Sequence, residues 1–271
     1  MSSEGYHRLP SLSASGAKTL LQPGGPAKYR WLMDHRDERP TKDAWDEGHC
    51  IHHFVFGSDP APIPVDAADW RTKAAKEQRD KIRAHHGVPL LRKDYDRCQT
   101  IAAAVLENPD AASLLLHPDG GRAGVAEEPI FWTDPETGIS LRARPDWRSD
   151  DWSVIVDLKS TTDASADGFA RSVYKYGYDV QAELYRAGVR ELHGVDAAFV
   201  FLCVETTPPY LTQCHILDDT YAAIGHNRFR RAVELWHDCT TTGIWPGYRT
   251  GWDKPRLSPP NWITYLEDEA S

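Results

Sequence analysis

Residues 143–161 read ARPDWRSDDWSVIVDLKST, and this segment constrains the fold more than any other part of the chain. Side chains alternate between the two faces of a strand, so Asp157 and Lys159 share one face while Val156 and Leu158 point the other way into a core. The polar turn at 148–151 is short enough to make the flanking strands neighbours. The segment therefore predicts a hairpin that presents charged side chains on one face of a sheet.

Two carboxylates, Asp146 and Asp157, belong to neighbouring strands of this hairpin, although the sequence does not set their register or separation. Mg²⁺ prefers carboxylate, carbonyl and water oxygens, and a bound metal can polarise a phosphate and help to generate hydroxide. Lys159 can orient the attacking water or stabilise developing charge. The pattern indicates metal-dependent phosphodiester hydrolysis, but a surface hairpin with scattered charges has the same spacing.

The rest of the pattern predicts an α/β protein. Residues 197–205, AAFVFLCVE, form a continuous apolar run of the kind found in fully buried strands. Further strands are expected near 124–133, 139–147, 152–159 and 210–217. Helices are expected over 43–57, 71–87, 94–107, 165–191 with a break at Gly177, and 218–241, with loops at 59–70 and after 107. Ser13 or Ser15 is expected to cap another helix that runs through Leu21.

We expect residues 1–271 to form one domain with a mixed central sheet flanked by helices. Its mainly helical N-terminal part would span 1–110 and its core 120–245. The tail at 246–271 is rich in Trp and Pro and would pack on the body. The chain is long enough to bury a substantial core.

Composition and charge limit where the protein can act and which cofactors and nucleic-acid contacts it can have. No apolar run approaches the ~20 residues of a membrane span, and the N-terminus lacks a signal-peptide pattern, so we expect a cytoplasmic protein. Five cysteines form no CxxC pair, which favours reduced thiols and disfavours a structural zinc or an iron–sulfur cluster.

A net charge of −9 disfavours a nonspecific nucleic-acid binder. DNA contact needs only a local basic track, however, and its candidates are Arg142, Arg144, Arg171 and Lys175.

Six segments in chain order carry a resemblance to a known family: YHRLPSLSASGAKTLL, EGHCIHHFVF, AEEPIFWTDPETG, LRARPDW, VDLKSTTDAS and GYDVQAELYRAG. They resemble the ordered motifs of the RecE-type, exodeoxyribonuclease VIII-like exonucleases, a phage and prophage branch of the PD-(D/E)xK nuclease superfamily. The resemblance implies a restriction-endonuclease-like core and processive 5′→3′ digestion of duplex DNA with Mg²⁺, for which Mn²⁺ would substitute. It also implies ring-like homo-oligomers threaded by DNA, a RecT-like single-strand annealing partner, and action in a bacterial host cell.

The resemblance also assigns metal ligands, which are His52, Asp146, Asp157 and the carbonyl of Leu158. Spacing alone does not choose between His52 and its neighbour His53, and a helical histidine is more often a packing residue than a ligand. Gly48 lies four residues before His52 on the same helical face, which would let the helix approach the sheet closely.

Four further positions match the family's catalytic motifs: Lys159 the catalytic lysine, Gln181 and Tyr185 the Gln-x-x-x-Tyr pair, and Glu127 an acidic residue that opens the first core strand. Gln181 and Tyr185 lie on one helical face, where they would either orient groups near the phosphate or simply brace the sheet. Glu127 would touch a metal directly, act through water, or merely lie at a strand end.

Some assignments stay open at this level. Arg142 and Arg144 share the expected strand face of Asp146, so they would contact either phosphate or the site's carboxylates. Trp147 is a candidate for stacking on DNA ends, whereas Glu128, Asp150 and Asp151 are expected to be surface charges.

Three alternative functions stay open. The first is another PD-(D/E)xK nuclease that is specific for single strands or for a DNA structure. The others are a noncatalytic DNA- or partner-binding module on the same fold and a metalloenzyme that acts on small phosphoesters.

Overall fold

The computed structural model describes residues 3–35, 43–248 and 257–259, and its centre is a five-stranded mixed sheet. The strand order is β3–β6–β7–β8–β9. Only β7 and β8 run parallel, and the other neighbours are antiparallel. The strands are β3 (Gly124–Ala126), β6 (Trp147–Ser149), β7 (Val154–Thr161), β8 (Ala198–Glu205) and β9 (Thr212–His215).

Two smaller ribbons stand beside this sheet. An antiparallel pair joins β4 (Ile130–Thr133) to β5 (Ser140–Ala143), and a parallel pair joins β1 (Pro62–Val65) to β2 (Val88–Leu91). The helices are α1 (Ser3–Arg8), α2 (Ala14–Leu20), α3 (Gly25–Asp34), α4 (Asp43–Phe56), α5 (Lys73–Ala84), α6 (Arg92–Glu107), α7 (Pro109–Leu115), α8 (Ala166–Tyr176), α9 (Tyr178–His193) and α10 (Asp219–Thr242).

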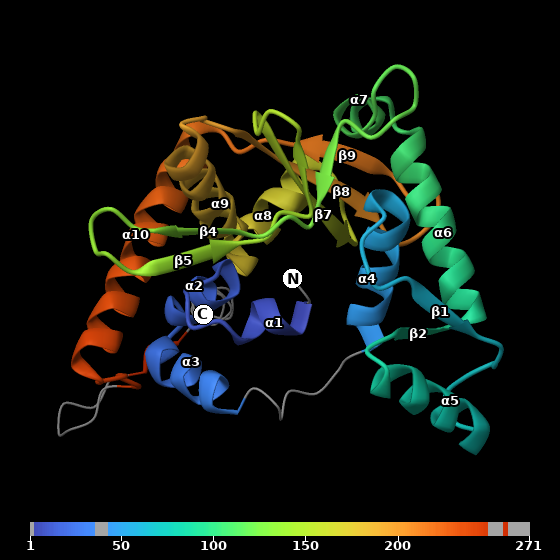
Figure 1. Ribbon diagram of the computed structural model, residues 1–271, viewed down its shortest axis with the longest axis horizontal. Helices are drawn as coiled ribbons and strands as arrows, with labels where there is room; N and C mark the ends of the chain where they lie inside the picture. The colour runs from blue at the N-terminus through green and yellow to red at the C-terminus, as the bar shows by residue number, and fades with distance from the viewer. Residues whose placement is uncertain (1–2, 36–42, 249–256, 260–271) are drawn as a thin grey trace, which may run out of the picture.

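Both faces of the central sheet are covered by helices (Figure 1). Ile155, Phe199 and Phe201 belong to a core shared with α2, α9 and α10, whereas Val156 and Val200 belong to a second core shared with α4, α6 and α7. Successive residues of β7 and β8 thus enter opposite cores, as a period of two requires. The mixed α/β fold is the one the sequence predicts, and no described helix is long and apolar enough to cross a membrane.

Local signals place several elements where the sequence predicts them. Ser13 caps α2 by accepting a hydrogen bond from the Gly16 N–H. Gly177 has a φ of 66°, a left-handed conformation that suits glycine, and it separates α8 from α9. Residues 43–56, 92–107 and 219–242 are helical, close to the expected bounds.

The strand expected over 139–147 is wrong, because the chain divides it into β5 and β6. Pro145 lies between the two pieces, and proline has no N–H to donate to a sheet ladder. Consequently β5 pairs with β4 outside the central sheet, while β6 joins it beside β7. Arg142 and Asp146 therefore do not share one strand face.

Three short elements occur where loops or helix ends were expected. Strands β1 and β2 have four residues each, too few for a clear alternation. Helix α7 begins at Pro109, behind an Asn108 side chain that accepts from the N–H groups of Asp110 and Ala111. This cap followed by proline is a helix-start signal that the sequence does contain. Most of the tail at 246–271 lies outside the described residues, so its packing and the domain bounds remain predictions.

Candidate metal centre

The β6–β7 hairpin brings the two candidate carboxylates together. Trp147 pairs with Val156 and Arg148 with Ile155, which sets Asp146 opposite the middle of β7. The Leu158 N–H donates to Asp146 Oδ2 at 2.8 Å. Asp146 is thus held by the strand that carries Asp157, as the predicted hairpin requires.

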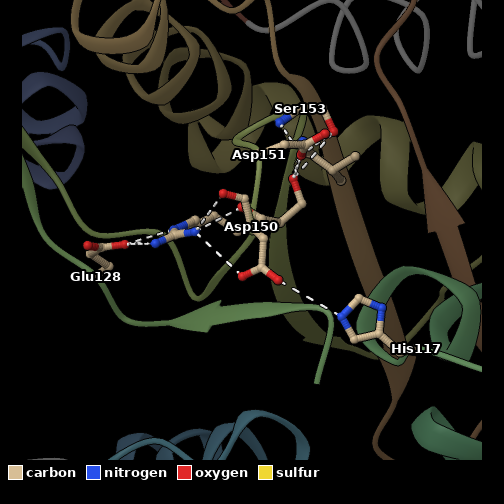
Figure 2. A network of polar contacts seen from close by, with 8 residues as sticks. His117, Glu128, Asp150, Asp151 and Ser153 are labelled. Carbon is tan, nitrogen blue, oxygen red and sulfur yellow. Dashed lines mark hydrogen bonds and ion pairs between the residues drawn. The ribbon is translucent and has the colours of Figure 1, made fainter. Parts of the chain in front are cut away.

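The turn of this hairpin is fixed by its own polar groups (Figure 2). The Asp151 carboxylate accepts from the hydroxyls of Ser149 and Ser153, each at 2.7 Å, while Arg148 donates to Glu128. Asp150 is 66% exposed and lies 3.9 Å from the His117 Nε2. These charges stabilise the turn at the surface, as expected, and stand apart from the two site carboxylates.

Asp157 is almost completely buried, with 1% of its surface exposed. The Gln181 Nε2 donates to Asp157 Oδ1 at 2.5 Å, and the Lys159 Nζ forms a close ion pair with Oδ2. Apart from this ion pair, Oδ2 has no hydrogen bond. A buried carboxylate oxygen without a hydrogen bond is costly unless a cation neutralises it.

The charged form of Asp146, the second carboxylate, is also disfavoured by its surroundings. Burial and the Asp157 charge raise the pKa of Asp146 well above its ordinary value, against the opposing influence of Lys159 and the Leu158 N–H. Its side chain keeps 20% of its surface exposed, so solvent moderates this shift. Two carboxylates that disfavour each other's charge form a site that a divalent cation would stabilise.

His52 reaches this carboxylate pair from α4. Its Nδ1 lies 3.6 Å from Asp146 Oδ2, and its ring packs edge-on against Phe56. Burial, reinforced by Lys159, lowers the pKa of His52 to about 4, so the imidazole is neutral at pH 7 and can act as a ligand. His53 instead points to the Ser58 carbonyl, 2.5 Å from its Nδ1. The geometry therefore brings His52, and not His53, to the carboxylates.

This donor set fits a hard divalent cation in its chemistry: two carboxylates, a neutral imidazole and the Leu158 backbone. Within the described residues, no three His, Cys, Asp or Glu side chains already converge as closely as the ligands of a bound ion. Asp157 is engaged by Lys159 and Gln181 instead. Metal binding at this site would therefore require Asp157 to exchange part of those contacts.

A second lysine, Lys18, which matches none of the predicted site positions, enters the site from α2. Lys18 donates to Gln181 Oε1 at 2.8 Å, while Lys159 Nζ lies 3.5 Å from the same oxygen. Both ammonium groups also lie over the Tyr178 ring, at 5.0 and 4.5 Å from its centroid. No spacing rule connects residue 18 with residue 181, so only the family-like opening segment SASGAKTLL could have drawn attention to it.

The two lysines have opposite pKa shifts. Burial and the Lys159 charge lower the pKa of Lys18 to about 7. Burial acts on Lys159 in the same direction, but Asp157 and Asp146 outweigh it and raise its pKa. At neutral pH Lys159 is therefore fully charged, while Lys18 is close to its titration midpoint.

Tyr185 and Glu127 border the site. The Tyr185 hydroxyl donates to the Arg144 carbonyl at 3.2 Å, just before the Pro145–Asp146 turn, so it braces the backbone that presents Asp146. Glu127 has a φ of 50°, and its N–H donates to the Asp146 carbonyl at 3.2 Å. The Glu127 carboxylate lies 3.8 Å from Arg144 Nη1. Arg144 is thus engaged with an acidic residue at the site's margin.

Two expectations about the site's surroundings are wrong. The Arg142 guanidinium is buried, with the residue 3% exposed, and Nη1 donates to the carbonyls of Leu9 and Ser11. It therefore braces the N-terminal segment and cannot contact DNA. Trp147 is 1% exposed within the second core, so it cannot stack on a DNA end. Arg171 and Lys175 are exposed on α8, where DNA contact remains a prediction.

Comparison with known proteins supports the same fold. A family model described as a PDDEXK-like domain of unknown function (DUF3799) matches residues 13–253. The crystal structure of a presumed exonuclease from Eubacterium rectale aligns with a TM-score of 0.64 at 16% identity, covering 98% of this chain and 97% of that one. No curated protein sequence matches the chain significantly.

A phage-related exonuclease from Haemophilus somnus 129PT aligns over 89% of this chain and 100% of its own, at 14% identity. Its TM-score of 0.34 is too low to add to the argument. The Eubacterium structure, at its low identity, supports the fold and not the reaction. Together, the family match and this fold likeness agree with the PD-(D/E)xK architecture that the motifs predict.

Proposed function

Because the chain belongs to the family of PDDEXK-like domains of unknown function (DUF3799), we propose that it is a metal-dependent deoxyribonuclease. The observation that carries this proposal is the grouping of Asp146, Asp157 and Lys159 on one hairpin, with His52 beside them. These residue types are the ones that phosphodiester hydrolysis with a hard cation requires.

In this proposal His52, Asp146, Asp157 and the Leu158 carbonyl hold Mg²⁺, with Mn²⁺ as a substitute. When bound, the ion would polarise the phosphate and lower the pKa of water. Lys159, charged at neutral pH, orients the attacking water or stabilises the charge that develops on the phosphate. Gln181 orients the Asp157 carboxylate through its amide N–H.

The proposed polarity, processivity and assembly rest on the ordered motifs and their likeness to RecE-type exonucleases. The chain would digest linear duplex DNA processively in the 5′→3′ direction and leave 3′ single-stranded tails for recombination. It would act as a ring-shaped homo-oligomer around DNA, beside a single-strand annealing protein in the bacterial cytoplasm. Exposed Arg171 and Lys175 on α8 would contact the DNA backbone.

The test is digestion of linear duplex DNA labelled at the 5′ or the 3′ end, with and without Mg²⁺, beside a closed circular control. We expect early release of the 5′ label as mononucleotide while circles stay intact. Cut circles would indicate an endonuclease on the same fold. DNA that is bound but never cut would replace the proposal with a noncatalytic binding module.

Asp157→Ala should abolish cutting because it removes a central ligand, while the fold stays intact by circular dichroism. The matched control is Asp150→Ala, which removes an exposed carboxylate from the turn of the same hairpin. We expect this control to cut within about twofold of the wild-type rate, since exposed surface charges contribute little. Equal activity of the Asp157→Ala variant and the wild type would contradict the assigned site.

A further inference from the structure

A cavity of about 300 Å³ is lined by Lys159 but by neither carboxylate, and the proposed chemistry does not use it. It lies where the parallel strands β7 and β8 end, between Thr161, Thr206 and helix α8. In α/β sheets, ligands bind preferentially outside the carboxyl ends of parallel strands. This position makes the cavity a candidate for the part of a substrate beyond the attacked phosphate.

The walls of the cavity present three kinds of group. Lys159 supplies a cation at one end, and Ser172 and Thr206 supply hydroxyls that have no partner within the described part of the protein. Tyr176 and Tyr178 form an aromatic wall, with ring centroids 5.7 Å apart. Phosphate, sugar and base are the parts of a nucleotide that these groups complement.

Tyr176 is the residue of this wall that is open to a ligand. It is 50% exposed, whereas Tyr178 is partly covered by Phe169 and by the two lysines of the site. The exposed Lys175 has its Nζ 5.1 Å from the Tyr176 ring centroid, which adds a second positive charge beside this aromatic wall. An exposed aromatic ring in a positively charged groove is typical of sites that bind single-stranded nucleic acid.

We propose that this cavity binds the nucleoside of a single terminal nucleotide, with its base stacked on Tyr176 and its sugar against the Ser172 and Thr206 hydroxyls. The inference rests on the proposed nuclease function, whose attacked phosphate would lie at Lys159. The volume is at the lower end of the range for ligand pockets, about 300–1,000 Å³. It suits one nucleotide and not a base pair, so the terminal nucleotide unpairs before it is cleaved.

The first test compares Tyr176→Ala, Tyr176→Phe and Tyr174→Ala on linear duplex DNA. Tyr174 is a matched control, because it is 59% exposed on the same helix but packs against Arg228 and does not line the cavity. Base stacking on an aromatic residue contributes about 1–3 kcal/mol, a factor of roughly 5–150. We expect Tyr176→Ala to lower kcat/KM at least fivefold, and the other two variants to stay within twofold.

A second test separates this inference from the nuclease proposal. Titration calorimetry with dAMP and with deoxyribose 5-phosphate, in EDTA, should show tighter binding of dAMP by the wild type. The Tyr176→Ala variant should lose that preference and the Tyr174→Ala variant should keep it. Equal binding of the two ligands by the wild type would overturn the base site even if DNA is cut. A preference for dAMP without any DNA cleavage would keep the base site and reject the nuclease.

Discussion

Gln181 is the residue at which the positive and negative parts of the site meet. Its amide oxygen accepts from Lys18 and lies near Lys159, so its NH₂ group must face Asp157. The orientation of this amide is thus set by charge, since an amide oxygen cannot donate to a carboxylate. Through Gln181, helix α2 influences how the Asp157 carboxylate is presented.

Lys159→Ala should lower kcat by about 10²–10³-fold, the usual loss when one group that stabilises transition-state charge is removed. The concentration of Mg²⁺ that gives half-maximal activity should not rise, because Lys159 is not among the assigned ligands and its loss removes an ion pair that competes with the metal for Asp157. Single-turnover cleavage measured across a Mg²⁺ titration checks both statements. Cleavage at the native rate would remove Lys159 from the mechanism.

Lys18 should give the protein a distinctive dependence of stability on pH. Its pKa is about 7 when folded and near its ordinary value of 10.5 when unfolded. Between these two values the unfolded chain binds more protons, so the free energy of unfolding rises with pH over this window. Below about pH 7 the full cost of burying the charge is present, and it disappears as pH rises towards 10.

We therefore expect the wild type to gain stability relative to Lys18→Met between pH 7 and pH 10. Urea unfolding of both proteins in EDTA at pH 6, 7, 8.5 and 10 measures this difference, and titrating groups that do not interact with Lys18 cancel because both proteins share them. The matched control is Lys175→Met, whose exposed lysine should leave the difference flat. A constant difference between the wild type and Lys18→Met would contradict the shifted pKa.

At the scale of elements, two helical glycines play opposite roles. A Cβ on Gly225 would lie 2.7 Å from the Asp179 carbonyl, so glycine allows α10 to approach the first turn of α9. Arg228 of α10 also pairs with both carboxylate oxygens of Asp179. By contrast, a Cβ on Gly48 would meet nothing within 4 Å, so close approach of α4 to the sheet does not explain Gly48.

Gly225→Ala should destabilise the protein by about 1–3 kcal/mol, because the added methyl meets backbone that cannot yield easily. Gly48→Ala is its matched counterpart and should stabilise by about 0.5–1 kcal/mol through helix propensity alone. Chemical unfolding of the two variants and the wild type checks the signs. A stabilising Gly225→Ala would refute the close contact between α9 and α10.

At the scale of the whole molecule, the central sheet separates two cores, and the candidate site depends on elements from both. His52 comes from α4 on one side, while Lys18 and Gln181 come from α2 and α9 on the other. The carboxylates lie on the hairpin between them. A ligand bound at this site would therefore connect the two halves of the protein.

Mg²⁺ should raise the Tm, because a ligand that binds only the folded state stabilises it by about 2.7 kcal/mol at 100 times its Kd. For a chain of this size that corresponds to a rise of several degrees, at roughly 2–4 °C per kcal/mol. His52→Ala should lose most of this rise and the neighbouring His53→Ala should keep it. Scanning fluorimetry with Mg²⁺ or EDTA measures the shift, and an equal shift in both variants would exclude His52 as a ligand.

Much of the fold and several site contacts follow from local sequence. The alternation through VIVDLKST and the apolar run at 197–205 determine strands whose successive side chains enter opposite cores. Ser13 and Gly177 determine where helices begin or end through their own caps and backbone preferences. The short turn after Arg148 makes β6 and β7 neighbours. These features depend on residues close together in the chain, so pattern alone can reveal them.

Only the tertiary structure decided which side chains complete the site. Lys18 and Gln181 are separated by 163 positions, and no local pattern joins them. Arg142 turns inward because β5 leaves the central sheet for β4, where Leu9 and Ser11 accept its hydrogen bonds. Such contacts depend on how distant elements pack, since packing sets the distance, burial and charge around each group. The sequence alone thus determined the hairpin, its carboxylates and Lys159 beside them, whereas packing determined that Lys18 joins Gln181 at the site.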